Sequence, residues 1–364
     1  MTLTSMLVET CLSRLPARTG ADALSVARRC LIDSLACGYA AADEQPIRML
    51  RETLCTGRRG GESSVIGHPD RARAGDAALV NGTMISLQLF DDSHVQMRGH
   101  PSGPLLPAVL AVGEAEDRDL AEALTAFVVG CELECRLGLA LNPSHYEIGW
   151  HATATQGIMG AAMACALLLG LDRVRAAHAL GIAASMAGGL RRNFGTMTMS
   201  LHSGLAASGG VRAARLAAAG YTADPGVFDG AMSYGDVFSR EWSPQTLAQD
   251  LVHWGAPFAI VTPGPGIKLF PLGRPALAAV DAVIALRDQH GISPADVESI
   301  TCEVSYMYPR TLIHSHPATG LQGKTSLQYC VAATLVDGRP WFASFSDEAT
   351  VRGLFDLMEN RKAT

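Results

Sequence analysis

The segment ATATQGIMGAAMACALLLGL, residues 152–171, runs for twenty residues without a single charged side chain. A helix of this composition has no polar face to turn towards water, so it does not suit a surface position. Its Ala, Gly and Thr residues make it too weakly hydrophobic for a membrane span. The segment therefore predicts a helix that is buried on all sides, and such a helix needs several other helices to cover it.

The composition favours the same architecture. Aromatic residues make up only 6% of the chain, and Ala and Gly dominate the small residues. Small side chains let helix axes approach closely, and Ala has the highest helix propensity, so we expect packed helices rather than an all-β fold. A chain of 364 residues that is 48% hydrophobic can build one large core or two modest ones. We expect two domains.

The sequence pattern changes near residue 260. The Pro- and Gly-rich stretch VTPGPGIKLFPLG indicates a crossover between domains. The stretch VESITCEVSYMY (297–308) is then the first with the alternation typical of a strand. The sequence predicts a mainly α protein, with a large all-helical body over residues 1–262 and a smaller α+β lid domain over residues 263–364.

Charge and cysteine usage exclude several functions. The net charge is −6 and no basic run occurs, so a nucleic-acid partner is not expected. The nine cysteines include no CxxC pair, which argues against a zinc ribbon or a dithiol redox motif. The N-terminus has no long apolar core behind a basic start, so a signal peptide is not expected. We expect a cytoplasmic protein with reduced cysteines and no membrane association.

Titratable side chains gather in the stretch FDDSHVQMRGHPSGPLLP, residues 90–107. Three interpretations are open. The polar groups could satisfy loop amides at a helix end. They could bind a metal, although the spacing matches no ligand motif such as HExxH. They could also perform acid–base chemistry, because His titrates near neutral pH and His100 is fixed by the following proline.

Three further polar groups lie in otherwise apolar surroundings. His151 precedes the uncharged helix, and a histidine at such a place is more often structural than catalytic. Arg191, Arg192 and His202 lie close together in the sequence, where the arginines could clamp carboxylates or simply face solvent. Lys268 stands between apolar residues in GIKLFP, which indicates burial.

The order of these motifs resembles the MmgE/PrpD family over nearly the whole chain. The stretches that carry the resemblance are CLIDSLACGYA, AALVNGT with LFDDSH and HPSGPLLPA, GWHATATQGIMGAA, GTMTMSLHSGLAASGG, IKLFPLGRPALAAVDA and KTSLQYCVAATLVDG. Any one would be weak, whereas six in this order are specific. Known members include dehydratases, decarboxylases and epimerases of small di- and tricarboxylates.

The resemblance implies a pocket between the body and the lid, and it implies roles for particular residues. His100 and His151 match the family's catalytic histidines, Lys268 matches the lysine at the crossover, and Tyr308 matches a lid tyrosine. The residues that we expect to bind substrate are Asp91, Asp92, Ser93, Arg191, Arg192, His202 and Arg274. No metal and no cofactor are expected, and the family resemblance also implies a homodimer.

The sequence departs from the family pattern at two positions. Leu89 stands where D-F-D-D has its first aspartate, and Met199 stands where T-K-P-L-H has its lysine. A carboxylate and an ammonium lost together leave no unpaired buried charge if they were partners. The sequence also stops before the strand-rich tail that members usually carry, so we expect a lid without that tail.

The function that these residues predict is a cofactor-independent enzyme that abstracts a proton α to a carboxylate. A dehydratase- or decarboxylase-type lyase for a small di- or tricarboxylate fits best. Two alternatives remain open, an epimerase of an iminodisuccinate-like substrate and a non-catalytic member that acts as a binding or scaffold protein.

Overall fold

The computed structural model describes residues 1–55 and 61–353. The chain divides into two compact units. The first, which we call the body unit, contains Met1–Leu87, Asp91–Arg192 and Ser200–Ile267. The second unit contains Gln88–Phe90, Asn193–Met199 and the chain from Lys268 onward. Two short segments from the first part of the chain thus belong to the second unit, and a single boundary between residues 1–262 and 263–364 does not describe them. That boundary stays a prediction.

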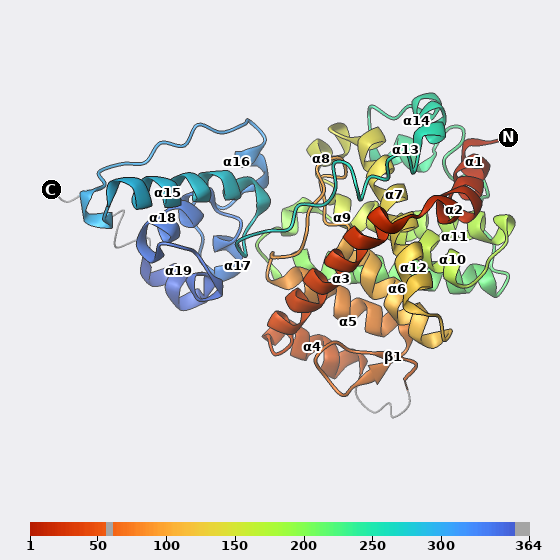
Figure 1. Ribbon diagram of the computed structural model, residues 1–364, viewed down its shortest axis with the longest axis horizontal. Coiled ribbons are helices and arrows are strands. Elements are labelled where there is room, and N and C mark those ends of the chain that lie inside the picture. Colours follow the sequence, from red (N-terminus) through yellow and green to blue (C-terminus); the bar gives the residue numbers. More distant parts are fainter. Residues whose placement is uncertain (56–60, 354–364) are drawn as a thin grey trace. The chain divides into compact units, whose positions relative to one another are not determined.

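The body unit is helical (Figure 1). Its helices are α1 (Leu3–Glu9), the π-helical turn η1 (Thr10–Arg14), α2 (Leu15–Arg18), α3 (Ala21–Ala41), α4 (Gln45–Leu54), α5 (Ala74–Leu87), α6 (Ser102–Ala115), α7 (Leu120–Leu141), α8 (Ser144–Ile148), α9 (Ala152–Thr155), α10 (Gly157–Leu168), α11 (Arg173–Met186), α12 (Met197–Ala218), α13 (Tyr234–Phe238) and α14 (Pro244–Asp250). Two 3₁₀ turns, η2 (Arg191–Asn193) and η3 (Leu251–His253), complete the set. One short antiparallel hairpin, β1 (Ser63–Ser64) with β2 (Arg71–Ala72), interrupts it.

Helix α10 is the central helix of the body unit. It packs against α7, α6 and α11, and nearly every one of its residues is buried. The prediction of a fully surrounded helix in residues 152–171 is thus confirmed, with a break at Gln156 that separates α9 from α10. Within the described residues, no helix has both the length and the apolarity that crossing a membrane requires.

Glycines set how closely the central helices approach. A Cβ on Gly130 of α7 would lie 2.9 Å from the carbonyl oxygen of Gly160 on α10, and a Cβ on Gly160 would lie 2.8 Å from that of Gly130. Real side chains do not tolerate such distances, so α7 and α10 can pack at this separation only with glycine at both positions. Gly82 of α5 and Gly204 of α12 form a similar contact.

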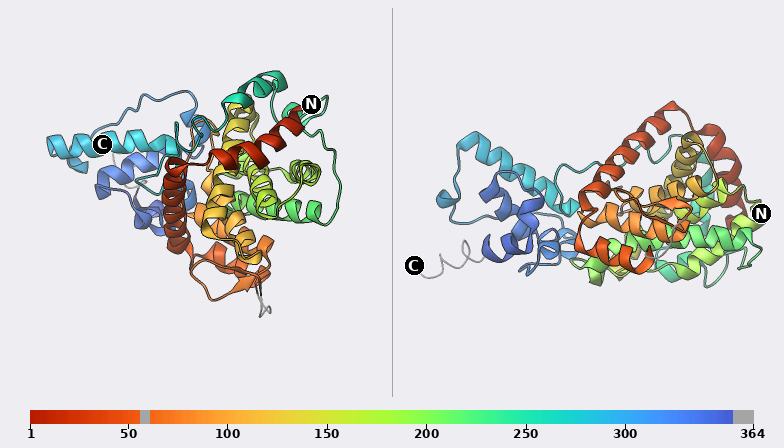
Figure 2. Two further views of the ribbon diagram at one scale, coloured as in Figure 1. Left: turned by 45° about the vertical axis from the view of Figure 1, so that its right-hand side comes forward. Right: turned by 90° about the horizontal axis from the view of Figure 1, so that it is seen from below.

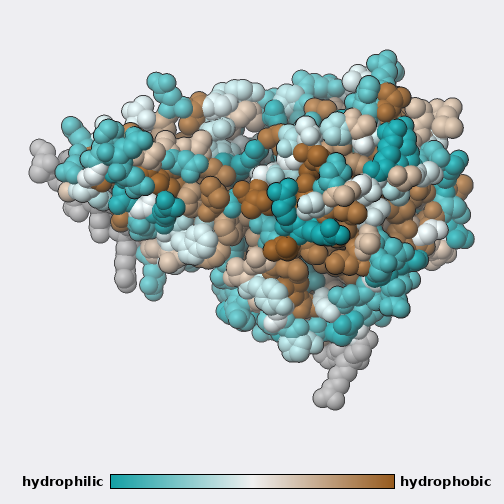
Figure 3. All heavy atoms as spheres, viewed as in Figure 1, coloured by the Kyte–Doolittle hydropathy of each residue, from teal (hydrophilic) through white to brown (hydrophobic). Residues whose placement is uncertain are grey.

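Helix α3 covers one side of the body unit. It packs against α5, α6 and α7, and Figures 1 and 2 show it as the red helix beside these orange and yellow helices. Its inner face buries Ala27, Cys30 and Cys37. Ile32 and Tyr39 lie on its outer face and are 68% and 63% exposed. The face drawn in Figure 3 accordingly mixes brown apolar side chains with teal charged ones.

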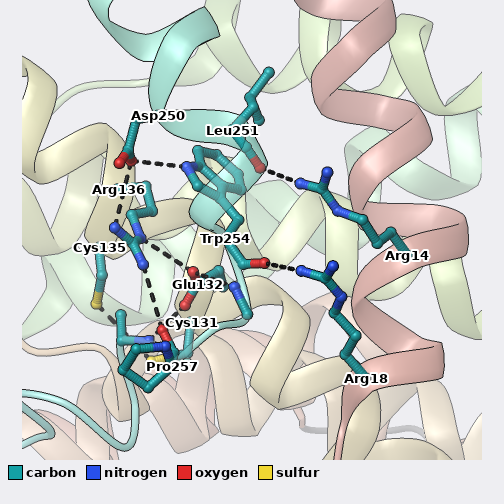
Figure 4. Close-up of polar contacts among 12 residues, drawn as sticks. Arg14, Arg18, Cys131, Glu132, Cys135, Arg136, Asp250, Leu251, Trp254 and Pro257 are labelled. Atoms are coloured by element: carbon teal, nitrogen blue, oxygen red, sulfur yellow. Dashed lines mark hydrogen bonds and ion pairs between the residues drawn. The ribbon is translucent and has the colours of Figure 1, made fainter.

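A buried ion pair ties the segment after α14 to α7 (Figure 4). The Glu132 carboxylate accepts hydrogen bonds from Arg136 Nε (3.0 Å) and from the backbone amides of Gly255 (3.0 Å) and Ala259 (2.5 Å). Arg136 also contacts Asp250, 3.3 Å away. Because Glu132 has no exposed surface, these contacts offset part of the large cost of burying its charge.

The second unit has its own small core. Its elements are η4 (Arg274–Ala276), α15 (Leu277–His290), η5 (Pro294–Asp296), α16 (Tyr308–Thr311), α17 (Gly320–Gly323), α18 (Leu327–Asp337), η6 (Phe342–Phe345) and α19 (Asp347–Gly353). Helices α15 and α18 pack together around Leu272, Val280 and Cys330. Ser326 caps α18 by accepting a hydrogen bond from the Tyr329 amide.

The mainly α class is confirmed, but the strand expected at residues 297–308 is wrong. Residues 299–305 have no regular structure, and α16 begins at Tyr308. The side chains do alternate, since Cys302 and Val304 are half-buried between exposed neighbours. A strand also needs a partner for its backbone groups, and within the described residues the only paired strands are β1 and β2 of the body unit.

Candidate active site

The loop between α5 and α6 is organised by Asp92. This residue has no exposed surface, and its carboxylate accepts hydrogen bonds from the Ser102 amide (3.2 Å) and hydroxyl (2.6 Å) at the first turn of α6. His94 closes the loop by donating its amide to the carbonyl of Gly99 (2.9 Å). The carboxylate of Asp92 is thus engaged by the start of a helix, which is the first of the three interpretations that the sequence left open.

Burial changes the protonation of Asp92. Desolvation raises its pKa to about 7, the hydrogen bonds from Ser102 lower it, and the nearby Asp91 carboxylate raises it. Half or more of the Asp92 side chains are therefore neutral at slightly acidic pH. A neutral carboxyl donates a hydrogen bond as well as accepting one, so in this form Asp92 repels an anionic group less than a carboxylate would.

His100 is held in one tautomer by its neighbours. Its Nδ1 lies 2.6 Å from the backbone carbonyl oxygen of Asp92 and 3.4 Å from a carboxylate oxygen of Asp91. Both neighbours are acceptors, so Nδ1 carries a proton and donates it. Asp91 is itself buried and accepts a hydrogen bond from Ser86 Oγ (3.0 Å). The neutral ring consequently keeps its lone pair on Nε2, and the Asp91 carboxylate compensates the positive charge when Nε2 takes up a proton.

His151 forms a pair with His202. Their Nδ1 atoms are 3.0 Å apart, so one ring donates from Nδ1 and the other accepts there. Both side chains are buried, at 6% and 4% exposure. Desolvation lowers the pKa of His202 to about 4. It also holds the pKa of His151 well below its ordinary value, and repulsion from a protonated His202 or His100 and from the Arg191 guanidinium lowers it further. At neutral pH both rings are neutral, and they share a single hydrogen bond.

Threonines and a further histidine fix the His151 segment. The His100 amide donates to Thr153 Oγ1 (3.1 Å), which brings the two histidine segments side by side. Thr155 Oγ1 lies 2.8 Å from Nε2 of the fully buried His145 and 3.3 Å from the His151 carbonyl oxygen. The sequence prediction missed His145 and Thr155 as supports of the site. Their spacing around His151 was visible, but no sequence signal distinguished them from ordinary loop residues.

The two arginines differ in their surroundings. Arg191 donates to the Tyr146 carbonyl (2.6 Å), and its guanidinium stacks 3.7 Å from the centre of the Tyr146 ring. Arg192 is exposed. Ser93 is buried, its backbone pairs with Gly266, and its Oγ has no hydrogen-bond partner in the described part of the chain. A substrate role for these three residues stays a prediction.

The second unit holds the remaining predicted site residues. Lys268 is 3% exposed, as the sequence indicated, and its Nζ donates to the carbonyl of Leu89 (2.8 Å). Arg274 is exposed at η4, and Tyr308 is half-buried at the start of α16. A second lysine, Lys324, is also buried and donates to the carbonyl of Gln88 (3.1 Å). The sequence prediction did not select Lys324.

The two residues that depart from the family pattern meet in the structure. Leu89 and Met199 form a small buried apolar cluster with Phe194, and each is 7% exposed. The two positions that the family pattern fills with an acid and a base are therefore neighbours within the second unit. Their joint replacement by apolar side chains leaves no unpaired charge at this point.

Comparison with known proteins identifies the family. The MmgE/PrpD N-terminal domain matches residues 2–247, and the MmgE/PrpD C-terminal domain matches residues 270–359. The chain belongs to the MmgE/PrpD family.

Curated relatives carry the names of decarboxylases. Cis-aconitate decarboxylase of Homo sapiens is 28% identical over 331 residues, which cover 88% of this chain and 67% of the relative. Cis-aconitate decarboxylase of Aspergillus terreus is 27% identical, covering 90% of the chain and 70% of the relative. Cis-aconitate decarboxylase-like protein oryM of Aspergillus oryzae is 32% identical, over 60% of the chain and 47% of the relative. The chain thus spans about two thirds of the first and second of these relatives, and the family and its relatives indicate a lyase.

Proposed function

We propose that the protein is a decarboxylase- or dehydratase-type lyase for a small di- or tricarboxylate, and that it works by acid–base chemistry without a cofactor. The observation that carries this proposal is the Asp91–His100 pair. A carboxylate 3.4 Å from Nδ1 fixes the tautomer and supports the charge of a proton carried on Nε2. His100 is the residue of this pair with partial exposure, 25% of its side chain, as a group that meets substrate requires.

The two lyase reactions need the same proton carrier. In decarboxylation of an unsaturated tricarboxylate, the C–C bond to one carboxylate breaks and CO₂ leaves. The released electron pair forms a new C=C bond, and the electrons of the old double bond take a proton at carbon. In dehydration, a base removes a proton α to a carboxylate, and the leaving hydroxide takes a proton to become water. His100 delivers the proton in the first case and removes it in the second.

His151 has a different role because it is neutral. Its pKa is held well below the ordinary value, so it is not the imidazolium that delivers a proton at neutral pH. A neutral ring can still accept a proton or donate a hydrogen bond to a substrate oxygen. We assign His151 to this position, with His202 holding its orientation through the 3.0 Å contact.

The substrate carboxylates need cations. Lys268, Arg274, Arg191 and Arg192 are the proposed partners, with Tyr308 as a further contact from the lid. The relatives act on cis-aconitate by name, which makes this tricarboxylate the first substrate to test.

The test is product analysis in D₂O with cis-aconitate, methylcitrate-like hydroxyacids and iminodisuccinate, followed by NMR and CO₂ detection. Decarboxylation should release CO₂ and place one solvent deuterium on carbon. Dehydration would give an alkene without CO₂. Exchange of an α hydrogen without net product would instead indicate the epimerase alternative. No turnover and no exchange with any of these substrates would favour the scaffold alternative.

We further propose that the protein self-associates as a homodimer in the cytoplasm. Helix α3 supports this, because Ile32 and Tyr39 expose large apolar surfaces on its outer face. Sedimentation equilibrium at micromolar concentration should give twice the chain mass, and a single-chain mass at all concentrations would contradict the proposal.

A further inference from the structure

Helix α7 carries a second group of reactive side chains that the proposed chemistry does not use. Cys131, Glu134 and Cys135 lie three and four positions apart, on one face of the helix. All three have no exposed surface. One ligand atom from each lies within 4.8 Å of the others. Figure 4 shows the two sulfur atoms side by side, next to the Glu132–Arg136 ion pair.

The separation of the two sulfur atoms matches a metal site. Cys131 Sγ and Cys135 Sγ are 3.9 Å apart. In tetrahedral zinc sites the Zn–S bond is about 2.3 Å, which places two coordinating sulfur atoms about 3.8 Å apart. The helix thus holds the two thiols at the spacing that zinc needs, without a change in the backbone.

The Glu134 carboxylate gives a second, independent indication that an ion binds here. Both of its carboxylate oxygens are buried and have no hydrogen-bond partner among the described residues. A buried polar group in this state is costly, and an ion or a water molecule is the usual explanation.

The surroundings of Glu134 are polar enough to complete a coordination shell. A Cβ on Gly157 would lie 3.6 Å from Glu134 Oε2, which places the carboxylate against the start of α10. The neighbouring Gln156 is fully buried, and neither its amide oxygen nor its amide nitrogen has a partner among the described residues. Its oxygen lies over Gly138, one helical turn beyond Glu134 on the same face of α7.

We propose that Cys131, Glu134 and Cys135 form a buried structural site for one thiophilic divalent cation, for which zinc fits best. Two thiolates and a carboxylate are ligands that zinc accepts, and the fourth position is left to the Gln156 oxygen or to a water molecule. A disulfide between the two cysteines explains less, because it would leave the Glu134 carboxylate without a partner. The proposed ligands include none of the histidines to which the acid–base chemistry above is assigned.

The test is elemental analysis of untagged, full-length protein purified from cells grown with added zinc. We expect about one equivalent of zinc per chain after gel filtration. Cys131→Ser, Cys135→Ser and Glu134→Gln should each lower the zinc content at least several-fold. Cys165→Ser is the matched control: it replaces an equally buried thiol on α10 outside the cluster, and it should keep the zinc.

A second measurement does not depend on the stability of the variants. Wild-type protein from cobalt-supplemented cells should show near-ultraviolet thiolate-to-cobalt absorption and the strong visible bands of tetrahedral cobalt. Wild-type protein without stoichiometric metal from both media would overturn the proposal. So would a crystal structure of that protein in which a water molecule and no metal lies between Glu134 and the two thiols, or zinc that remains when both Cys131 and Cys135 are replaced.

Discussion

His100 and His151 occupy different electrostatic surroundings, although they lie on adjoining segments. His100 is partly exposed beside the Asp91 carboxylate, whereas His151 is buried against a second imidazole and lies near positive charges. The first environment supports a charged ring and the second opposes one. This asymmetry divides the proposed chemistry into a proton carrier and a neutral hydrogen-bonding partner.

The raised pKa of Asp92 predicts a pH dependence of stability. The carboxyl has an ordinary pKa of 3.8 and reaches about 7 in the folded protein. Between these values the folded state binds a proton that the unfolded state lacks, so the free energy of unfolding falls as pH rises through this range. Asp92→Asn removes this contribution. The stability of the wild type relative to Asp92→Asn should therefore fall by roughly 2–4 kcal/mol between about pH 4 and pH 7, by the conversion of pKa units to free energy.

Urea unfolding at a series of pH values measures this difference. Asp172→Asn is the matched control, since Asp172 caps α11 through a side chain that is 64% exposed. The control should keep the wild-type pH slope. A slope for Asp92→Asn equal to that of the wild type would show that Asp92 does not take up a proton in the folded state.

The cluster of Leu89, Phe194 and Met199 predicts a double-mutant coupling. Met199→Lys alone should cost about 3 kcal/mol or more, because it buries a single charge in an apolar cluster. Leu89→Asp alone should cost less, because the buried Lys268 Nζ lies 2.8 Å from the Leu89 carbonyl oxygen. The double variant should recover at least about 1 kcal/mol of the summed loss, because adjacent opposite charges compensate one another. Denaturant unfolding of the four proteins gives the coupling energy.

Leu89→Asn is the control for shape and backbone at this position. Leu89 has a positive φ of 51°, a conformation that Asn adopts more readily than Leu. Asn has the shape of Asp without its charge, so the difference between the two variants isolates the charge. Losses that simply add in the double variant would mean that the two positions do not interact.

Among the helices, the close contact between α7 and α10 allows the packing to be tested by a single substitution. Gly130→Ala would place a Cβ 2.9 Å from the Gly160 carbonyl oxygen, so the helices must move apart. We expect a loss of about 1–3 kcal/mol in the free energy of unfolding, the usual cost of overpacking. Thermal and denaturant unfolding measure it.

Gly113→Ala on α6 is the matched control for this substitution. Gly113 is also a buried helical glycine, but the nearest atom to an added Cβ is 3.9 Å away. Its replacement should leave the stability unchanged or raise it by up to about 1 kcal/mol, through the higher helix propensity of Ala. Equal losses at both positions would show that the close contact does not set the cost.

The helices could be predicted from the sequence much better than the strand. The uncharged segment around Gly160 has a composition that only a buried helix accommodates, and the structure places it at the centre of the body unit. Cys302 and Val304 alternate as a strand would, but alternation reports local pattern and says nothing about a partner. Whether a segment forms a strand depends on a partner strand elsewhere in the chain, and the local sequence pattern does not show whether that partner exists.

For the molecule as a whole, the order of the motifs was enough to predict the family. The contacts between side chains inside the site could be found only from the structure. The sequence singled out His100 and His151 through their motifs. It did not reveal that Asp92 binds Ser102, that His151 pairs with His202, or that Leu89 meets Met199. Each of these contacts joins residues that the fold brings together, and their spacing in the sequence carries no signal of it.

The proposed function requires that His100 and His151 act together in one acid–base site. The direct measurement is a double-mutant cycle on the rate at which solvent deuterium enters the product of whichever substrate the protein converts. His290→Ala, on the exposed end of α15, is the folding control. His100→Ala and His151→Ala should each lower the rate by about 10²–10⁴-fold. The double variant should lose far less than the product of the two, because groups that act as a unit are not additive. Wild-type rates in either single variant, or losses that multiply in the double variant, would contradict the claim.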